Sequence, residues 1–549
     1  MPEESVRPLE RGLAVLRAIA AADDQVRAGD LVRATGLARS TVDRVVATLA
    51  RIGYVREQGQ ELHLTPRLMG LGNAYLAASG LSGEVAARTA RLADELDESV
   101  SLAVPDGDGV RFVTQAARRR AMSVAFRIGD LLPAERCAPG ALFAAEWDEA
   151  GWAGWRARVA ADPEGRAFPA LPPGPAAPPP EPADLADRVE RSRMTGWALD
   201  NQLIEPGLIA TAVPVRDAAG RTRYALSAVS HTSRHTAQGL AELVLPRLRE
   251  EAARLEELPK DQAAYADAEL TEAQGPDATD TTDAKAQLGP DFLQSLARGL
   301  TVLRALGRAR GDGLPLTAIA AATGLPRATA RRCLHTLALE GYAALDGRLY
   351  RPLPRILELG YARLSRLGFA DIAEPHLRQL TARVHQSASV TVLDGTDILY
   401  VARAATVRVM SVYITLGTRF PAHPTAMGRV LLAGLPKRDR TRLLKAAPPT
   451  SLTRRTVTDP AELNRVLDRA AADGYATADE ELEEGLRSVA VPLKDAEGRV
   501  VAALNVAQHA GTTPLDETIG ALLPALRETA AAIEADLHTA ARFNGVLMP

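Results

Sequence analysis

The sequence repeats itself once over almost its whole length of 549 residues. The run Leu9–Arg17 returns as Leu296–Arg304, and Met122-Ser123-Val124 returns as Met410-Ser411-Val412. A period this long indicates a duplicated protein rather than a solenoid of short repeats. The Pro-rich stretch 168–182 is the obvious insertion in the first copy, and we expect a surface loop there. The chain should therefore consist of two copies of one folded module.

Composition excludes several classes of protein. With 46% hydrophobic and 24% charged residues the chain is ordinary globular protein, and its net charge of -3 leaves only local basic faces for nucleic acid. The two cysteines, Cys137 and Cys333, lie far apart and form neither a disulfide framework nor a zinc pattern. No signal peptide or membrane-length apolar run is present. We therefore expect a cytoplasmic protein without a cofactor or bound metal.

The start of each copy has the pattern of a helix-turn-helix. A leucine-striped helix opens the copy, and a short helix ending at Gly36 follows. The third helix buries Val42, Val45, Val46 and Leu49 in copy 1 and Ala330, Cys333, Leu334 and Leu337 in copy 2. Its opposite face is basic in both copies, as a recognition helix requires.

A hairpin follows each third helix and predicts a wing. The hairpins run from Tyr54 to Leu64 and from Tyr342 to Leu353, the second turning at Asp346-Gly347. A basic helix face is more often merely solvated, but here turn, stripe and wing recur in the same order. We predict that double-stranded DNA is contacted by Arg39, Ser40, Thr41, Arg44, Arg327, Thr329, Arg331, Arg332 and His335.

After a connecting helix (66–79 and 352–367), each copy continues as an α/β domain. In copy 2 we predict strands at 388–393, 398–403, 409–416, 489–494 and 500–508, and helices at 425–432 and 461–473. The fold class is therefore α+β and multidomain.

The motifs of both copies resemble those of the IclR family of bacterial regulators. The resemblance rests on Leu-x-Arg-Gly-Leu-x-Val-Leu, on Thr-Gly-Leu between the helices, and on the motifs 423–433 and 480–492. It covers nearly the whole chain, once per copy. The segments 400–403, 408–412 and 417–421 are most similar to the subgroup that regulates protocatechuate and β-ketoadipate catabolism.

The resemblance implies two winged helix-turn-helix domains, each followed by a GAF-like effector domain that binds a small organic acid. It also implies dimers, which we expect to form first between the two winged helices of one chain, with a homodimer as a further possibility. The family's ligand positions fall on Val409, Val412, Phe420, Ala426, Met427, Asp479, Leu486, Ser488, Asn505 and Ala507. Arg408 and Arg487 are added because a guanidinium binds a carboxylate with two hydrogen bonds.

Copy 1 departs from this pattern. Cys137-Ala138-Pro139 stands where copy 2 has Thr425-Ala426-Met427, and Ile209 stands in place of Arg487. We therefore expect the first pocket to have lost its charged groups, so that it is either structural or selects a less polar ligand. Acid sensing is expected in copy 2.

The predicted domain boundaries follow from these patterns. They are 1–65 and 291–351 for the winged helices, 66–83 and 352–370 for the connecting helices, 84–257 and 371–542 for the effector domains, 258–290 for an acidic flexible linker, and 543–549 for a tail. Two other functions remain open. The acidic run 480–484 and the isolated His423 and His509 suggest an enzyme, although no catalytic motif supports one. The other possibility is a ligand sensor that pairs with another regulator and does not itself contact DNA.

Overall fold

The computed structural model describes residues 5–22, 26–81, 83–118, 126–171, 182–258, 289–309, 313–406, 414–511 and 513–543. The chain divides into two compact units, Met1–Ser365 and Arg366–Pro549. The first unit contains both winged helices and the first effector domain, and the second unit is the second effector domain. Of the predicted linker 258–290, residues 259–288 lie outside the described part of the chain, and of the Pro-rich insertion 168–182, residues 172–181 do.

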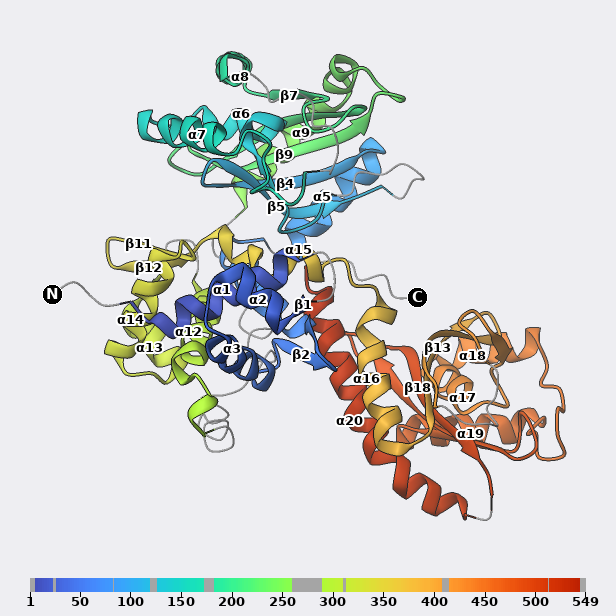
Figure 1. The fold of residues 1–549 in the computed structure, drawn as a ribbon. Coiled ribbons are helices and arrows are strands. Elements are labelled where there is room, and N and C mark those ends of the chain that lie inside the picture. Colours follow the sequence, from blue (N-terminus) through green and yellow to red (C-terminus); the bar gives the residue numbers. More distant parts are fainter. Residues whose placement is uncertain are drawn as a thin grey trace. The chain divides into compact units, whose positions relative to one another are not determined.

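The first winged helix has the predicted order of elements (Figure 1). It consists of α1 (Arg7–Ala21), β1 (Val26–Arg27), α2 (Ala28–Thr35), α3 (Arg39–Arg51), β2 (Val55–Gln58) and β3 (Glu61–Leu64). Helix α2 ends at Gly36, whose left-handed backbone (φ 67°) suits a residue without a Cβ atom. The predicted stripe of α3 is buried, because it packs against α1 and α2.

The second winged helix repeats this arrangement. Its elements are α12 (Gln294–Ala305), β10 (Leu314–Pro315), α13 (Leu316–Thr323), α14 (Arg327–Leu339), β11 (Ala343–Asp346) and β12 (Leu349–Pro352). The wing turns at Gly347, as expected. The two winged helices thus confirm the sequence prediction for this half of each copy.

The connecting helices differ between the copies. In copy 1 a short turn, η1 (Pro66–Leu68), leads into α4 (Met69–Ala78), as predicted. In copy 2 the single predicted helix 352–367 is wrong, because the segment breaks into η5 (Pro354–Glu358) and α15 (Tyr361–Leu364). Gly360 lies between them with φ 107°, a conformation outside any helix, and a Cβ there would lie 2.6 Å from a methyl carbon of Leu64.

The first effector domain is a six-stranded antiparallel sheet with helices on both faces. The strands are β4 (Ser99–Asp106), β5 (Gly109–Ala116), β6 (Leu131–Pro133), β7 (Ala198–Asn201), β8 (Leu208–Arg216) and β9 (Thr222–His231), in the order β6-β5-β4-β9-β8-β7. On one face lie α5 (Gly83–Leu96) and α9 (Ala237–Glu257). On the other lie η2 (Ala134–Arg136), α6 (Ala138–Ala144), α7 (Glu149–Ala161) and α8 (Pro182–Thr195).

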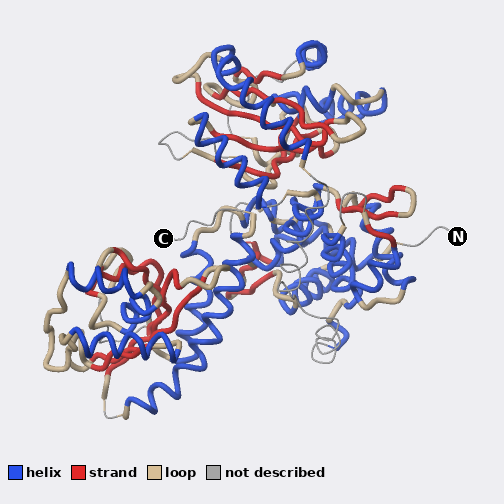
Figure 2. Tube along the Cα trace, turned by 180° about the vertical axis from the view of Figure 1, so that it is seen from behind, coloured by secondary structure: helices blue, strands red, loops and turns tan. Residues whose placement is uncertain are grey.

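The second effector domain has the same topology. Its strands are β13 (Ser387–Asp394), β14 (Asp397–Ala404), β15 (Arg419–Pro421), β16 (Ala476–Asp479), β17 (Leu486–Lys494) and β18 (Val500–His509), in the order β15-β14-β13-β18-β17-β16. Helices α16 (Phe369–Val384) and α20 (Leu515–Ala541) cover one face, and α17 (Ala426–Ala433) and α19 (Pro460–Asp473) pack against the other, with α18 (Lys437–Ala446) beside them (Figure 2). The shared strand order confirms that one α/β domain was duplicated.

The predicted strand 409–416 is wrong in its described part. Residues 414–416 form no strand, and the edge strand is instead β15, three residues long and paired with β14. Residues 409–413 lie outside the described part of the chain. The apolar run there has the composition of a strand, but Gly417, with φ 86°, turns the chain before pairing starts. Among the described helices, none is long and apolar enough to cross a membrane.

Candidate nucleic-acid interface and effector pockets

The two winged helices pack against each other through their first helices, α1 and α12. A Cβ atom on Gly12 would lie 2.2 Å from a Leu296 methyl carbon, and one on Gly299 would lie 2.5 Å from a Leu9 methyl carbon. Leu9 and Leu296 are equivalent residues of the two copies, as are Gly12 and Gly299. Each leucine therefore fills the space above the other copy's glycine, which is the reciprocity of a two-fold interface.

Two hydrogen bonds repeat the same reciprocity. The backbone N–H of Val6 donates to Thr336 Oγ1 at 2.8 Å, and that of Leu293 donates to Thr48 Oγ1 at 2.9 Å. Both threonines are buried in the recognition helices, and each also donates to a carbonyl oxygen one turn earlier in its own helix. Each recognition helix is thus fixed to the start of the other copy. The expected pairing of two winged helices within one chain is present in this unit.

The pair is not symmetric in its charges. Arg17 of copy 1 donates to Glu340 Oε2 at 2.9 Å and to the Tyr342 hydroxyl at 3.1 Å. The position equivalent to Glu340 in copy 1 is Ile52, so the first copy offers Arg304 no such carboxylate there. The interface therefore distinguishes the two copies.

The two recognition helices also present different charges to solvent. On α3, Arg39 Nε lies 2.8 Å from Asp43 Oδ1, and Arg44 Nε lies 3.8 Å from Asp291 Oδ1. On α14, the sequence Arg327–Leu339 contains no acidic residue. A carboxylate beside an arginine weakens the attraction of that arginine for phosphate. Helix α14 is therefore the more strongly basic of the two.

The predicted DNA contacts lie on the outer faces of these helices. Side chains at the start of both helices are exposed or half-buried, and none belongs to the apolar stripe that packs against the domain. Exposed are Arg39, Ser40, Arg44, Arg327, Arg331 and Arg332, and half-buried are Thr41, Thr329 and His335.

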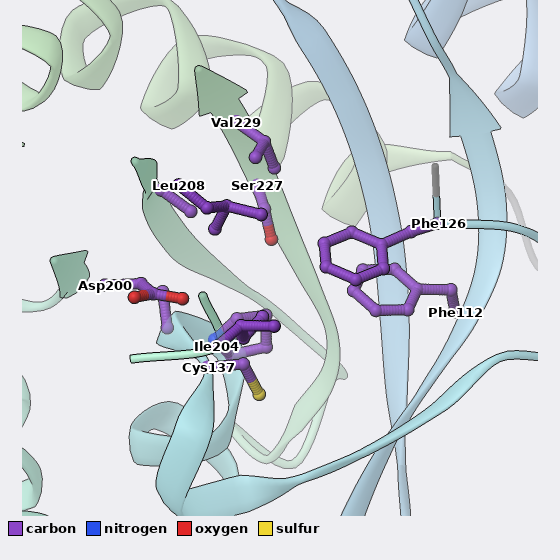
Figure 3. Close-up of a pocket in the computed structure, with 11 residues that line it drawn as sticks. Phe112, Phe126, Cys137, Asp200, Ile204, Leu208, Ser227 and Val229 are labelled. Carbon is purple, nitrogen blue, oxygen red and sulfur yellow. The ribbon is translucent and has the colours of Figure 1, made fainter. Parts of the chain in front are cut away.

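The first effector domain encloses a pocket between its sheet and α6 (Figure 3). Its space is about 240 Å³, including the part that opens to solvent. The rings of Phe112 and Phe126 stack on one side, with centroids 5.1 Å apart and planes 6° apart. Asp200, at the end of β7, lies on the other side, and Ser227 of β9 lies between them.

The carboxyl group of Asp200 is fully buried. Its Oδ1 accepts a hydrogen bond from the backbone N–H of Leu203 at 2.9 Å, whereas Oδ2 has no hydrogen-bond partner among the described residues. Burial raises the pKa of Asp200 to about 7, against the opposing effects of that hydrogen bond and of the Arg188 charge. The copy 1 pocket, which we expected to have lost the charged groups of copy 2, thus contains an ionisable group of its own.

In the second effector domain, several predicted effector residues share one face of the sheet. Ser488 and Ala507 are cross-strand partners, and Asn505 pairs with Ala490. Ala490 packs in the cluster that contains Ala426 and Met427 at the start of α17, and Leu486 and Ser488 alternate with Arg487 along β17. The sheet and α17 thus bring together Ala426, Met427, Leu486, Ser488, Asn505 and Ala507. Phe420 packs against the same cluster, edge-to-face with Tyr400.

Arg487 does not belong to that group. Its Nε donates to Asp479 Oδ1 at 2.6 Å, and its Nη1 donates to the Thr513 carbonyl oxygen at 2.6 Å and to Thr518 Oγ1 at 3.2 Å. Thr518 lies in α20, which covers the opposite face from α17. The prediction that Arg487 anchors a ligand carboxylate is wrong, because neighbouring residues of a strand point to opposite faces. Asp479 is likewise held by Arg487 and Arg455.

Three predicted effector residues, Arg408, Val409 and Val412, lie outside the described residues. Asp200, which replaces Ala478 of copy 2, was not among the residues predicted from the sequence. A strict alignment of the two copies carries this signal, because a carboxylate replaces alanine in an otherwise buried strand.

The acidic run 480–484, which suggested acid–base chemistry, forms a structural loop. Glu480 Oε2 accepts from the Gly485 N–H at 2.9 Å, and Glu481 pairs with the buried Arg429. His423 Nε2 lies 3.0 Å from the Thr450 carbonyl oxygen, so a proton on that nitrogen is donated to the backbone. Within the described residues no cluster of His, Cys, Asp and Glu has the arrangement of a metal site.

Comparison with known proteins bears on both halves of each copy. The model of the IclR helix-turn-helix domain matches residues 8–59 and 295–347, and that of the bacterial transcriptional regulator IclR C-terminal domain matches residues 179–256 and 361–535. The part of the first effector domain before residue 179 falls outside these matches, although its strands complete the same sheet.

Three curated relatives are transcription regulators. The Pca regulon regulatory protein of Pseudomonas putida is 45% identical over 43% of this chain and 81% of its own length. The Pca operon regulatory protein of Acinetobacter baylyi is 35% identical over 46% and 91%, and the p-hydroxybenzoate hydroxylase transcriptional activator of the same organism is 34% identical over 44% and 90%. Each alignment spans less than half of this chain, as expected for a duplicated protein.

These matches confirm the resemblance found in the sequence. The relatives are regulators and not enzymes, which confirms that prediction as well. Both copies carry the DNA-binding domain and the effector domain in the same order. The chain belongs to the IclR family of DNA-binding transcription regulators, as a tandem duplicate of the family's whole module.

Proposed function

We propose that this regulator controls the catabolism of aromatic acids, and that an aromatic or dicarboxylic acid bound in the second effector domain changes its affinity for operator DNA. The two-fold pair of winged helices inside one chain carries the DNA-binding part of the proposal, because it supplies two recognition helices without a second chain. The similarity to regulators whose names refer to pca genes and p-hydroxybenzoate hydroxylase supports the choice of pathway.

The second effector domain has polar groups suited to an acid. Asn505 is 2% exposed, and its Oδ1 has no hydrogen-bond partner among the described residues. Asn505 and Ser488 lie on neighbouring strands with apolar Met427 and Ala426 above them. Because Asn505 Oδ1 is an acceptor, it favours a ligand that brings a hydroxyl donor as well as its carboxylate, as a hydroxylated aromatic acid does.

The domain boundaries, the DNA-contacting residues and the effector residues predicted from the sequence, except Arg487, are part of this proposal. Both winged helices contact the operator through the exposed residues of α3 and α14, and the linker 258–290 joins the copies. The two cysteines are buried free thiols, as suits a cytoplasmic protein. A homodimer of the chain is a further level of assembly.

The test is operator binding with and without ligand. A DNA fragment from upstream of the regulated genes is titrated with the full chain, alone and with protocatechuate, β-ketoadipate or 4-hydroxybenzoate. We expect one of these acids to change the DNA affinity at least 5-fold, the lower range of ordinary coupling energies.

Variants then locate the acid. Asn505→Ser and Ser488→Ala introduce the residues of copy 1, Ser227 and Ala210, and should reduce the response to the acid while leaving DNA affinity without ligand unchanged. Asn464→Ser is the control, because that amide bonds the carbonyl oxygen of Pro460 in its own helix. If the acid changes the DNA affinity of both pocket variants as much as that of wild type, the acid binds at another site.

A further inference from the structure

The first effector domain contains a pocket whose chemistry differs from that of the second. Five buried polar atoms on its pocket-facing side have no hydrogen-bond partner among the described residues: Asp200 Oδ2, Ser227 Oγ, Ser101 Oγ, and Nε2 and Oε1 of Gln115, which pairs with Ser101 across the strands. Ser101 and Ser227 are direct cross-strand partners on β4 and β9. Unsatisfied buried groups are costly, and a cluster of them around one space indicates a missing partner.

The apolar part of the pocket suits an aromatic ring. Phe112 and Phe126 present a stacked pair of rings, and Ile204, Leu208 and Val229 complete the wall. The space of about 240 Å³ includes the part that opens to solvent, and only a small fraction of it is free to a water-sized sphere, so a ring can enter only if the apolar wall moves outward. A ligand with a single ring requires the least movement of that wall.

The charges around Asp200 oppose a ligand carboxylate. The charge of Arg188 acts on Asp200, but Arg188 does not line the pocket, and its two terminal nitrogens donate to the carbonyl oxygens of Glu135 and Cys137, at 2.8 and 2.6 Å. Only its buried Nε has no hydrogen-bond partner among the described residues. A ligand carboxylate would therefore meet the oxygen of Asp200 with no two-pronged guanidinium free to pair with it, and the desolvation of two such carboxylates is unfavourable.

The copies differ at the positions that decide this chemistry. Asp200 replaces Ala478, Ala210 replaces Ser488 and Ser227 replaces Asn505. Copy 1 therefore gains a hydrogen-bond acceptor where copy 2 has a methyl group, and it loses the amide donor of copy 2. The first pocket is better suited to a ligand that donates a hydrogen bond.

We propose that the first effector domain binds an uncharged, single-ring aromatic compound with a hydroxyl group, a phenol, whose hydroxyl donates to Asp200 Oδ2 while its ring lies against Phe112 and Phe126. Ser227 lies between these two walls and accepts or donates a second hydrogen bond. This site is separate from that of the second effector domain, and it exists whether or not that domain binds an aromatic acid.

Calorimetry on the full chain tests the proposal with phenol, toluene and benzoate, three probes that differ in one substituent. We expect phenol to bind more tightly than both toluene, which has no donor, and benzoate, which carries a charge. At about pH 8, where the Asp200 carboxyl group is mostly ionised, Asp200→Ala should lower the affinity for phenol 10-fold or more, as for a lost hydrogen bond to a charged group. Glu190→Ala, which removes an exposed carboxylate of α8, should leave it unchanged.

Asp200→Asn and thermal melts of each variant control for misfolding. The asparagine keeps an oxygen for the Leu203 N–H and places an amide, itself a donor, at the position of Oδ2. Its affinity for phenol should fall between those of wild type and Asp200→Ala. Absence of phenol binding, equal binding by wild type and Asp200→Ala, or tighter binding of benzoate than of phenol overturns the proposal. Operator binding, measured separately, reports on the regulator function alone.

Discussion

At the scale of single residues, the replacement of Ala478 by Asp200 is visible in an alignment of the two copies, but the burial of the Asp200 carboxyl group is visible only in the fold. Asp200 stands in Ala198-Leu199-Asp200-Asn201, where a polar residue near a strand end usually faces solvent. Its burial follows from pairing with Ala210 at the sheet edge and from α8 covering β7. Arg487 was misplaced for a different reason: it stands between Leu486 and Ser488 in one strand, so alternation alone places it on the face opposite to theirs.

Asp200 should make the stability of the chain depend on pH. Burial raises the pKa of this carboxyl group to about 7, whereas in the unfolded chain it is about 3.9. The folded state then holds its proton more tightly, so this contribution is fully present below about pH 4 and is lost as the pH rises to about 7, at up to about 1.4 kcal/mol per pH unit. Asp200→Asn lacks a titrating group.

Thermal melts of wild type and Asp200→Asn between pH 4.5 and 7.5 measure this effect. The melting temperature of the variant relative to wild type should rise steadily with pH. A difference that stays constant across the window would show that the Asp200 carboxyl group titrates alike in the folded and unfolded states.

Gly12 and Gly299 carry the reciprocal contact between the winged helices. A Cβ on either would overlap a leucine of the other copy, so Gly12→Ala and Gly299→Ala should each destabilise the pair by about 1–3 kcal/mol, the usual cost of overpacking. Gly29→Ala is the matched control, because a Cβ there meets no atom within 4 Å and alanine favours the helix. Thermal unfolding compares the three variants, and equal behaviour of all three would contradict the reciprocal packing.

At the scale of elements, the helices and their buried stripes were predictable, because a period of 3.6 residues requires no knowledge of the partner. The break at Gly360 was not, because it depends on the close approach of Leu64 from the other copy. The different charges of α3 and α14 were visible in part, since Asp43 is in the sequence, but its ion pair with Arg39 needed the structure.

Helix α14 should contribute more to operator binding than α3. Arg327→Ala with Arg331→Ala should weaken binding and reduce the dependence of log K on log salt by about two units, roughly one for each lost phosphate contact. Arg442→Ala on α18, outside both winged helices, is the control. Affinity and salt dependence that match wild type would show that α14 does not contact DNA.

On α3, removing the carboxylate should have the opposite effect. Asp43→Asn removes the ion pair that holds Arg39 and removes a negative charge from the face that approaches phosphate. We expect tighter operator binding, by about 2- to 5-fold, because exposed ion pairs contribute up to about 1 kcal/mol. A titration at fixed salt measures the change, and weaker binding would show that the pair positions Arg39 for contact.

At the scale of the whole molecule, duplication places a dimer's DNA-binding surface in one chain. Sequence alone gave the duplication and the family, but the pairing of the copies rests on contacts between residues more than 240 positions apart, such as Leu293 with Thr48. Because the two copies have since diverged, the chain offers two unlike recognition helices. We expect an operator with two unlike half-sites.

The number of chains bound per pair of half-sites tests this account most directly. Footprinting defines the half-sites of the operator, and light scattering gives the mass of the complex with a fragment that carries one pair. The account predicts one chain per pair of half-sites, and the same ratio if two chains bind a longer operator. Two chains bound to a single pair would show that each chain uses only one of its winged helices, and would contradict the pairing within one chain.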